Sequence, residues 1–180
     1  MRSFIIRMWG RIMDVFIRYA NTNDCVILGE IHSESLRFSC AGIFPDDYIM
    51  NKFSPERRRE GFRRELSLGY PETAILFADG IPAGLFTFGK SRYGEVDDSC
   101  IEIWRIYLKP EYIGKGFGTV LMEWGLEELR KKGYKQAVLW VLEDNHRARK
   151  FYERHGFVFD GKVRVFEDGI RELRYSKALD

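Results

Sequence analysis

A short glycine-rich segment has the composition of a phosphate-binding turn. Residues 110–118 read Pro-Glu-Tyr-Ile-Gly-Lys-Gly-Phe-Gly and lie between a strand-like stretch at 100–108 and an amphipathic stretch at 119–132. A turn that leads from a strand into a helix presents backbone N–H groups at the positive end of the helix dipole, where phosphate binds. Gly114, Gly116 and Gly118 have no Cβ atom to keep a diphosphate away from these amides. The segment predicts a site for a phosphorylated cofactor, and the alternative is a turn that only begins a helix.

Two familiar phosphate-binding motifs fit this segment poorly. A Walker-type loop has Ser or Thr directly after Gly-Lys, whereas Lys115 is followed by Gly116. In the dinucleotide motif, counting from Gly116 and Gly118, the third glycine position is occupied by Leu121. The next strand-like stretch, 136–142, also lacks the acidic residue that would bind a ribose. The cofactor is therefore expected to be of another kind.

Composition narrows the class of protein. A chain of 180 residues that is 45% hydrophobic is long enough for one domain with a proper core. A net charge of +2 gives no strong field for nucleic acid or an anionic membrane. The arginines at 57–64 alternate with glutamates, which favours a solvated helix face over a nucleic-acid site. Three widely spaced cysteines predict a reduced, cytoplasmic protein with no metal site.

The N-terminal residues are expected to stand apart from the domain. Phe4–Trp9 is apolar, but Arg7 interrupts it, and the stretch is too short for a membrane span. Strand-like patterning begins at Asp14. We therefore expect residues 1–13 to be an appendage and residues 14–180 to form one domain.

The order of the expected elements predicts an α/β fold with a mixed sheet. Helix starts are indicated at 21–24 and at Ser54-Pro55, and hairpin turns at Asp79-Gly80 and Asp168-Gly169. The stretches at 100–108, 119–132 and 136–142 form a parallel strand–helix–strand unit. The further expected elements are strands at 15–19, 73–78, 81–89, 157–160, 163–166 and 171–176, and helices reaching about residue 37, at 45–52 and at 145–155.

A second motif follows the apolar strand at 136–142. It reads Asn145-x-x-Ala148-x-x-Phe151-Tyr152-x-x-x-Gly156-Phe157. Its apolar residues share one helical stripe and could serve packing alone, but a buried tyrosine hydroxyl needs a polar partner. Together with the glycine turn, in this order, the motif resembles the GNAT superfamily of acyl-CoA-dependent N-acetyltransferases. The resemblance spans about 15–177, and residues 30–45 look like a subgroup that acetylates polyamines and other small amines.

The resemblance implies a fold and a cofactor. The fold is a single α/β domain with a mixed, mostly antiparallel sheet, whose central parallel pair splays apart at the cofactor, flanked by helices. The cofactor is acetyl-CoA, with its diphosphate on the glycine turn and its pantetheine arm along the strand before it. Ile113 departs from the family pattern, which usually has Gln or Arg there. The implied cofactor-binding residues are Ile106, Tyr107, Leu108, Ile113, Gly114, Lys115, Gly116, Phe117, Gly118, Thr119, Asn145 and Tyr152.

The resemblance also implies the chemistry, which is acetyl transfer to a primary amine by direct attack. Glu102 is the expected general base, directly or through water; the alternative is a surface glutamate on a strand that pairs with a charged neighbour. Tyr152 is the expected general acid for the departing thiolate, since a phenol has a pKa of about 10. No metal is expected.

The acceptor is expected to be a small-molecule amine. By the resemblance, its groove is formed by the first helix, the loop after it and the C-terminal hairpin, with His32, Ser35, Phe38 and Phe44 as wall residues. For His32 the alternative is a structural, partly buried histidine. A protein N-terminus or lysine as acceptor, and a non-catalytic CoA-binding domain, are the alternative functions. The resemblance also allows a homodimer, because many family members are dimers.

Overall fold

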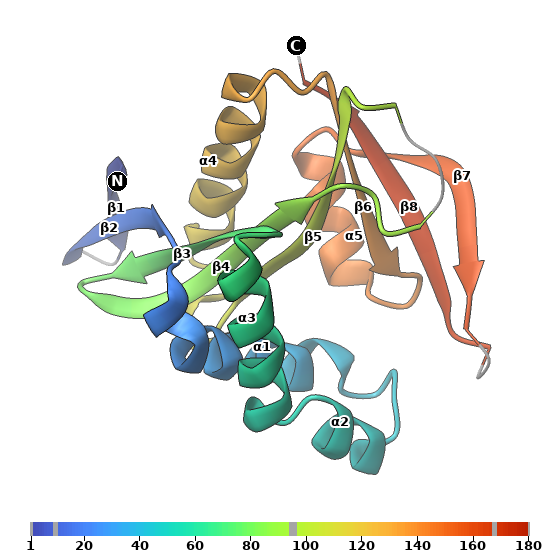
Figure 1. Cartoon of the computed structure of the whole chain (residues 1–180), viewed down its shortest axis with the longest axis horizontal. Helices are drawn as coiled ribbons and strands as arrows, with labels where there is room; N and C mark the ends of the chain where they lie inside the picture. Colours follow the sequence, from blue (N-terminus) through green and yellow to red (C-terminus); the bar gives the residue numbers. More distant parts are fainter. Residues whose placement is uncertain (1, 9–10, 94–96, 167–168, 180) are drawn as a thin grey trace. The chain divides into compact units, whose positions relative to one another are not determined.

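The chain, whose helices and strands are labelled in Figure 1, divides into two compact units, and the boundary between these units falls inside two elements. The computed structural model describes residues 2–8, 11–93, 97–166 and 169–179. Unit 1 comprises Met1–Phe88 and Arg105–Gly125, and unit 2 comprises Gly89–Trp104 and Leu126–Asp180. Strand β5 (Cys100–Leu108) and helix α4 (Phe117–Lys131) each contribute to both units.

The sheet of unit 1 begins with an antiparallel hairpin. Strands β1 (Arg2–Met8), β2 (Arg11–Tyr19), β3 (Glu72–Ala78) and β4 (Ile81–Gly89) are neighbours in that order, and β5 follows β4. The strand expected from residue 15 thus begins at Arg11 and pairs with β1. Whether residues 1–13 act as an appendage stays a prediction.

Three helices pack in unit 1: α1 (Cys25–Cys40), α2 (Asp46–Lys52) and α3 (Pro55–Leu68), with short 3₁₀ helices at Thr22–Asp24 and Pro110–Tyr112. The expected helix start at Ser54-Pro55 and the expected hairpin turn at Asp79-Gly80 are both confirmed. The Ser54 side chain accepts a hydrogen bond from the Arg57 amide, with Pro55 in the first turn. Asp79 and Gly80 have φ values of 48° and 79°, the positive φ of a tight hairpin turn. The core between helices and sheet includes Leu28, Ile31, Phe62, Ile75 and Leu85.

One glycine sets how closely α4 approaches the sheet of unit 1. A Cβ atom on Gly125 would lie 2.3 Å from Cζ of the Phe86 ring on β4. Phe86 is fully buried and also meets Trp124 edge-on, with 6.2 Å between ring centroids. Because no side chain stands between helix and ring at this point, α4 lies directly against β4.

In unit 2 the strand order is β5, β6 (Gln136–Leu142), β8 (Arg171–Ala178) and β7 (Val158–Val165). Strands β5 and β6 are parallel from the pair Cys100–Gln136 to the pair Ile103–Leu139, and the other pairs are antiparallel. The mixed α/β fold with a central parallel strand–helix–strand unit is thereby confirmed. The two strands expected at 157–160 and 163–166 are one strand, β7, with an irregular register between Phe159 and Val163. Asp168 of the expected turn lies outside the described residues.

Helix α5 (His146–Arg154) packs on one face of the unit 2 sheet. The buried Tyr175 of β8 donates a hydrogen bond from its hydroxyl to Glu153 Oε1 at 2.9 Å. The same hydroxyl accepts one from Arg149 Nε at 3.1 Å. Side chains alternate between the faces of a strand, so Glu172 and Arg174, on either side of Leu173, point to the face opposite Tyr175.

Candidate active site

The glycine turn has the backbone conformation that close contact with a ligand requires. It runs from the 3₁₀ helix Pro110–Tyr112 to the start of α4 at Phe117. Gly114 and Gly116 have φ values of 76° and 87°, in the left-handed region that favours glycine, and both are exposed. A Cβ atom built on either would meet nothing within 4 Å, so the surface beside the turn is open.

The amides of this turn divide into two groups. The Ile113 amide donates to the Pro110 carbonyl at 3.2 Å, so it is already engaged within the protein. The first amides of an α-helix have no intrahelical acceptor, which leaves those of Phe117, Gly118 and Thr119 available to an anion. The turn therefore presents helix-start amides beside an open surface, and the binding of a diphosphate by residues 113–119 stays a prediction.

The end of β5 that precedes the turn is half-buried, and side chains of α1 contact it. The Ser35 hydroxyl lies 2.7 Å from the Leu108 carbonyl oxygen, to which it can donate. The Tyr107 ring packs against His32, with 4.9 Å between ring centroids. Ile106 lies beside them on the same strand and is also half-buried. These contacts fix the strand on which the pantetheine arm is expected.

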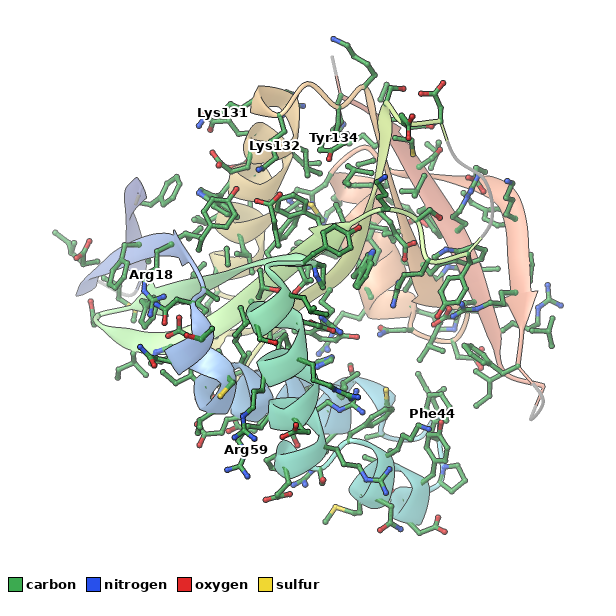
Figure 2. The ribbon with its side chains drawn as sticks, in the orientation of Figure 1. Arg18, Phe44, Arg59, Lys131, Lys132 and Tyr134 are labelled. Carbon is green, nitrogen blue, oxygen red and sulfur yellow. The ribbon has the colours of Figure 1, made fainter. Side chains whose placement is uncertain are left out.

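The four expected acceptor-wall residues do not share one environment. His32 and Ser35 are buried, and burial lowers the pKa of the His32 imidazole well below its usual value, with Arg105 and Arg58 adding to the effect. Phe38 is exposed. Phe44, labelled in Figure 2, is half-buried and stacks on Tyr48 with 5.1 Å between ring centroids. His32 is thus buried, and its place in the acceptor wall stays a prediction.

Helix α5 carries the two expected residues of the second motif. The Asn145 side chain accepts a hydrogen bond from the Ala148 amide at 3.0 Å and so caps the helix. Tyr152 is half-buried, and its ring lies edge-on to Phe151 and Phe157 at centroid distances of 5.6 and 6.2 Å. The tyrosine ring is thus held by aromatic neighbours within unit 2.

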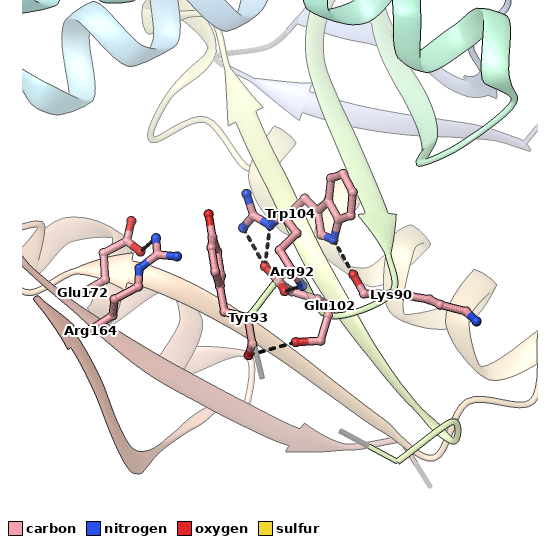
Figure 3. A network of polar contacts seen from close by, with 8 residues as sticks. Lys90, Arg92, Tyr93, Glu102, Trp104, Arg164 and Glu172 are labelled. Atoms are coloured by element: carbon pink, nitrogen blue, oxygen red, sulfur yellow. Dashed lines mark hydrogen bonds and ion pairs between the residues drawn. The ribbon is translucent and has the colours of Figure 1, made fainter. Parts of the chain in front are cut away.

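Glu102 is fully buried and bound by one arginine (Figure 3). Its Oε1 accepts from Arg92 Nε at 2.8 Å and from a terminal guanidinium nitrogen at 2.5 Å, and its Oε2 accepts from the Arg92 amide at 2.7 Å. Trp104, two residues further along β5, donates from its indole nitrogen to the Lys90 carbonyl at 3.0 Å. The loop after β4 is therefore fastened to β5 at two points.

A second arginine–glutamate pair joins β7 to β8 in the same unit. Arg164 donates to Glu172, its register partner, and the two side chains are 23% and 18% exposed. Burial raises the pKa of the Glu172 carboxyl, and the charge of Arg164 opposes this rise. The guanidinium carbon of Arg164 lies 3.6 Å from the centroid of the Tyr93 ring.

Sequence reasoning missed Arg92, Tyr93, Arg164 and Glu172. Arg92 and Tyr93 lie in a stretch that reads as a polar loop, which carries no periodicity. The Arg164–Glu172 pair could have been found, because both residues lie in an expected hairpin where opposite charges face each other. Among the described residues, no group of three or more His, Cys, Asp or Glu side chains could hold a metal ion. None of the described helices is long and apolar enough to cross a membrane.

Comparison with known proteins places this chain in a family. Residues 40–157 match the model of the acetyltransferase (GNAT) family. The spermidine N(1)-acetyltransferase of Thermoplasma acidophilum is 28% identical over 149 residues, which are 81% of this chain and 89% of that protein. An L-amino acid N-acyltransferase of Escherichia coli K12 is 25% identical over 147 residues, 82% of this chain and 81% of that protein.

The solved structures agree with these relatives. The PaiA N-acetyltransferase of Thermoplasma acidophilum, in complex with coenzyme A, has a TM-score of 0.66 and 25% identity, covering 89% of this chain and 97% of that one. The chain belongs to the GNAT family of acetyltransferases. It is an acyl-CoA-dependent N-acetyltransferase whose cofactor is acetyl-CoA, as the glycine turn and second motif predicted.

Proposed function

We propose that this enzyme acetylates the primary amine of a small molecule by direct attack of the amine. Bound acetyl-CoA supplies an activated thioester, so the protein needs no covalent intermediate of its own. The observation that carries the proposal is the glycine turn, whose open surface and helix-start amides fit a diphosphate. Relatives named for spermidine and for L-amino acids support a small acceptor over a protein.

The amine must lose a proton before it attacks, since an alkylamine has a pKa of about 10.4 and is mostly protonated at neutral pH. Glu102 is the proposed base, and it works through a water molecule. Both of its oxygens already accept hydrogen bonds from Arg92, which hinders direct contact with an incoming ammonium group. The water would carry the proton from the amine toward the carboxylate.

Tyr152 is the proposed general acid. It holds a proton on its Oη and gives it to the departing sulfur. The aromatic contacts to Phe151 and Phe157 support the role, because they keep the ring in a fixed orientation. Asn145, whose side-chain oxygen caps α5, would contact the pantetheine arm through its amide nitrogen.

The experiment is steady-state kinetics with a panel of amines, measured by CoA release, on the wild type and Tyr152→Phe. We expect Tyr152→Phe to lower kcat by about 10²- to 10⁴-fold, the range of general acid catalysis, with CoA affinity nearly unchanged. Full activity of the variant across pH would remove Tyr152 from the mechanism. Acetylation of peptides but of no small amine would favour the protein-acceptor alternative.

Cofactor binding has a separate test with a matched control. Gly116→Val should abolish the rise in melting temperature that acetyl-CoA produces, because a branched side chain is strained at positive φ and covers the amides. Gly80→Val places the same side chain at a φ of 79° in the β3–β4 turn and should keep the rise. Equal cofactor responses in the two variants would contradict the diphosphate site.

We also propose that the enzyme works in the cytoplasm, as a homodimer. The three cysteines support the location, because all are free and buried, as in a reducing compartment. Light scattering on the purified protein measures the oligomeric state, and a monomer mass at micromolar concentration would contradict the dimer.

A further inference from the structure

The orientation of the Glu102 carboxylate depends on one residue. Within the described part of the chain, every donor to its oxygens belongs to Arg92: the backbone amide donates to Oε2, and the guanidinium donates twice to Oε1. Glu102 lies on β5 and is completely buried, whereas Arg92 lies in the loop after β4, outside any helix or strand. Backbone pairing therefore fixes the acid but not the arginine that orients it.

Aromatic rings limit the movement of the Arg92 guanidinium. Its carbon atom lies 5.1 Å from the centroid of the Trp104 ring and 5.3 Å from that of the Tyr93 ring. A guanidinium group stacks well on the face of an aromatic ring. Trp104 stands on β5, and its indole nitrogen also donates to the Lys90 carbonyl. Tyr93, by contrast, belongs to the same loop as Arg92 and needs a support of its own.

A second arginine gives the Tyr93 ring this support. The ring stands between Arg92 and Arg164 (Figure 3), and its centroid lies 3.6 Å from the Arg164 guanidinium carbon. Tyr93 is 41% exposed, so the core of unit 2 holds little of it. Its ring also meets Trp140 edge-on, with 6.3 Å between ring centroids. The shortest of these contacts is the one with Arg164.

Arg164 is itself held in the hairpin of β7 and β8. It donates to Glu172, its register partner on β8. Its guanidinium carbon lies 5.4 Å from the Trp140 ring centroid and 4.7 Å from that of Phe166. The hairpin therefore presents a flat cationic group in a fixed position to the ring of Tyr93.

Arginines and rings thus alternate across unit 2, from β7 through the loop to β5. The order of this stack is Arg164, Tyr93, Arg92 and Trp104. We propose that Arg164 is a positioning residue for the reaction. Through Tyr93 it fixes Arg92, and Arg92 in turn orients the Glu102 carboxylate. The inference rests on the proposed function, in which Glu102 receives a proton through water, and a misplacement of about 1 Å in such a group costs about 10²-fold in rate.

The first test is a double-mutant cycle on kcat, measured by CoA release with the amine panel. Arg164→Gln should lower kcat by about 10- to 100-fold and leave the KM for acetyl-CoA unchanged, because the expected diphosphate contacts lie in the glycine turn. In a Glu102→Gln background the same change should cost less than about twofold, since residues that act as one unit are non-additive. An equal loss in both backgrounds would show that Arg164 acts without Glu102 and would overturn the inference.

Tyr93 offers a matched pair of variants, which also covers the case in which Arg164→Gln folds poorly. Tyr93→Leu removes the ring but leaves the Arg164–Glu172 pair, and it should lower kcat as Arg164→Gln does. Tyr93→Phe keeps both ring faces and should recover most of the wild-type kcat. Arg174→Gln is the control, because it breaks the Arg174–Asp160 pair between the same two strands and leaves the stack intact. Equal kcat values in Tyr93→Leu and Tyr93→Phe would overturn the inference.

The placement of Arg92 can be measured without turnover. NMR of isotope-labelled protein follows the exchange of the Arg92 Nε proton with solvent, which the hydrogen bond to Glu102 Oε1 slows. We expect exchange about tenfold faster in Arg164→Gln and Tyr93→Leu than in the wild type, and no change in Arg174→Gln. If Glu102→Gln keeps full activity, the proposed base is wrong, whereas faster exchange still supports the placement of Arg92 by Arg164. Wild-type exchange in both variants would overturn the inference.

Discussion

Strand β5 supplies one member to each of two arginine–glutamate pairs that lie in different units. In unit 1, Arg105 donates to both oxygens of Glu65 on α3, at 2.7 Å each, and its guanidinium lies 4.9 Å from the Phe62 ring. In unit 2, Glu102 accepts from Arg92, which comes from the loop after β4. The side chains of Arg105 and Arg92 are 17% and 32% exposed.

The two pairs join different kinds of elements. The Arg105–Glu65 pair joins a helix to a strand, so both partners are fixed by the core around Phe62 and the pair serves packing. The Arg92–Glu102 pair has its buried carboxylate on a strand and its arginine on a loop, and the arginine side chain is 32% exposed. The same two residue types thus fasten a helix to a strand in one unit and a loop to a strand in the other.

The largest effect on stability is expected from Arg92→Met. This change leaves the fully buried Glu102 carboxylate without its charged partner, and breaking a buried pair in this way costs about 3–5 kcal/mol. The loss is expected near 3 kcal/mol, because the backbone amide at position 92 still donates to Oε2. Urea unfolding at pH 7 measures it. A loss below 1 kcal/mol would show that the pair has no role in holding the loop.

A smaller effect is expected from Glu65→Gln. The glutamine still accepts a hydrogen bond from Arg105 but loses the charge, and hydrogen bonds to charged groups contribute about 1.5–3 kcal/mol. Unfolding stability should fall by about 2 kcal/mol, while kcat stays that of the wild type. Glu60→Gln on the same helix is the control, since its pair with Arg63 is exposed and contributes little. A lowered kcat in Glu65→Gln would break the contrast between the two pairs.

The smallest effect concerns His32, which lies beside the unit 1 pair. Its pKa is well below 6.5 in the folded protein because of burial, so the unfolded chain binds a proton that the folded chain does not. Stability should therefore decrease as pH falls through about 6.5, by about 1 kcal/mol between pH 7.5 and 5.5. His32→Phe, which keeps a ring against Phe62 and Tyr107, should flatten this part of the profile. Urea unfolding curves at both pH values measure this change. An equal loss of stability in the wild type and in His32→Phe would show that another group binds the proton.

Local signals predicted the fold well, because each acts over a few residues. Ser54-Pro55 begins α3, Asp79-Gly80 turns the β3–β4 hairpin, and the limits of β6 are those expected from its apolar run. The two strands expected at 157–160 and 163–166 form one strand, β7, because its register is irregular between Phe159 and Val163 but the pairing with β8 continues.

Side-chain partners were harder to foresee, because they join residues far apart in the chain or lie in loops without periodicity. That Glu102 is bound by Arg92 depends on how the loop after β4 folds back, which no spacing indicates. That the Ile113 amide is engaged depends on the 3₁₀ turn before it. The conformation of the glycine turn, by contrast, could be predicted from the sequence, because a positive φ favours glycine over other residues.

Helix α4, which begins at the cofactor turn, packs closely on the buried Phe86 ring, so the position of the helix depends on this contact. Gly125 lies on the helix whose first amides face the expected diphosphate, so any added volume at this position would lift the helix and shift those amides together. Affinity for the nucleotide end of the cofactor could accordingly be adjusted from within the core, through residues that never touch it.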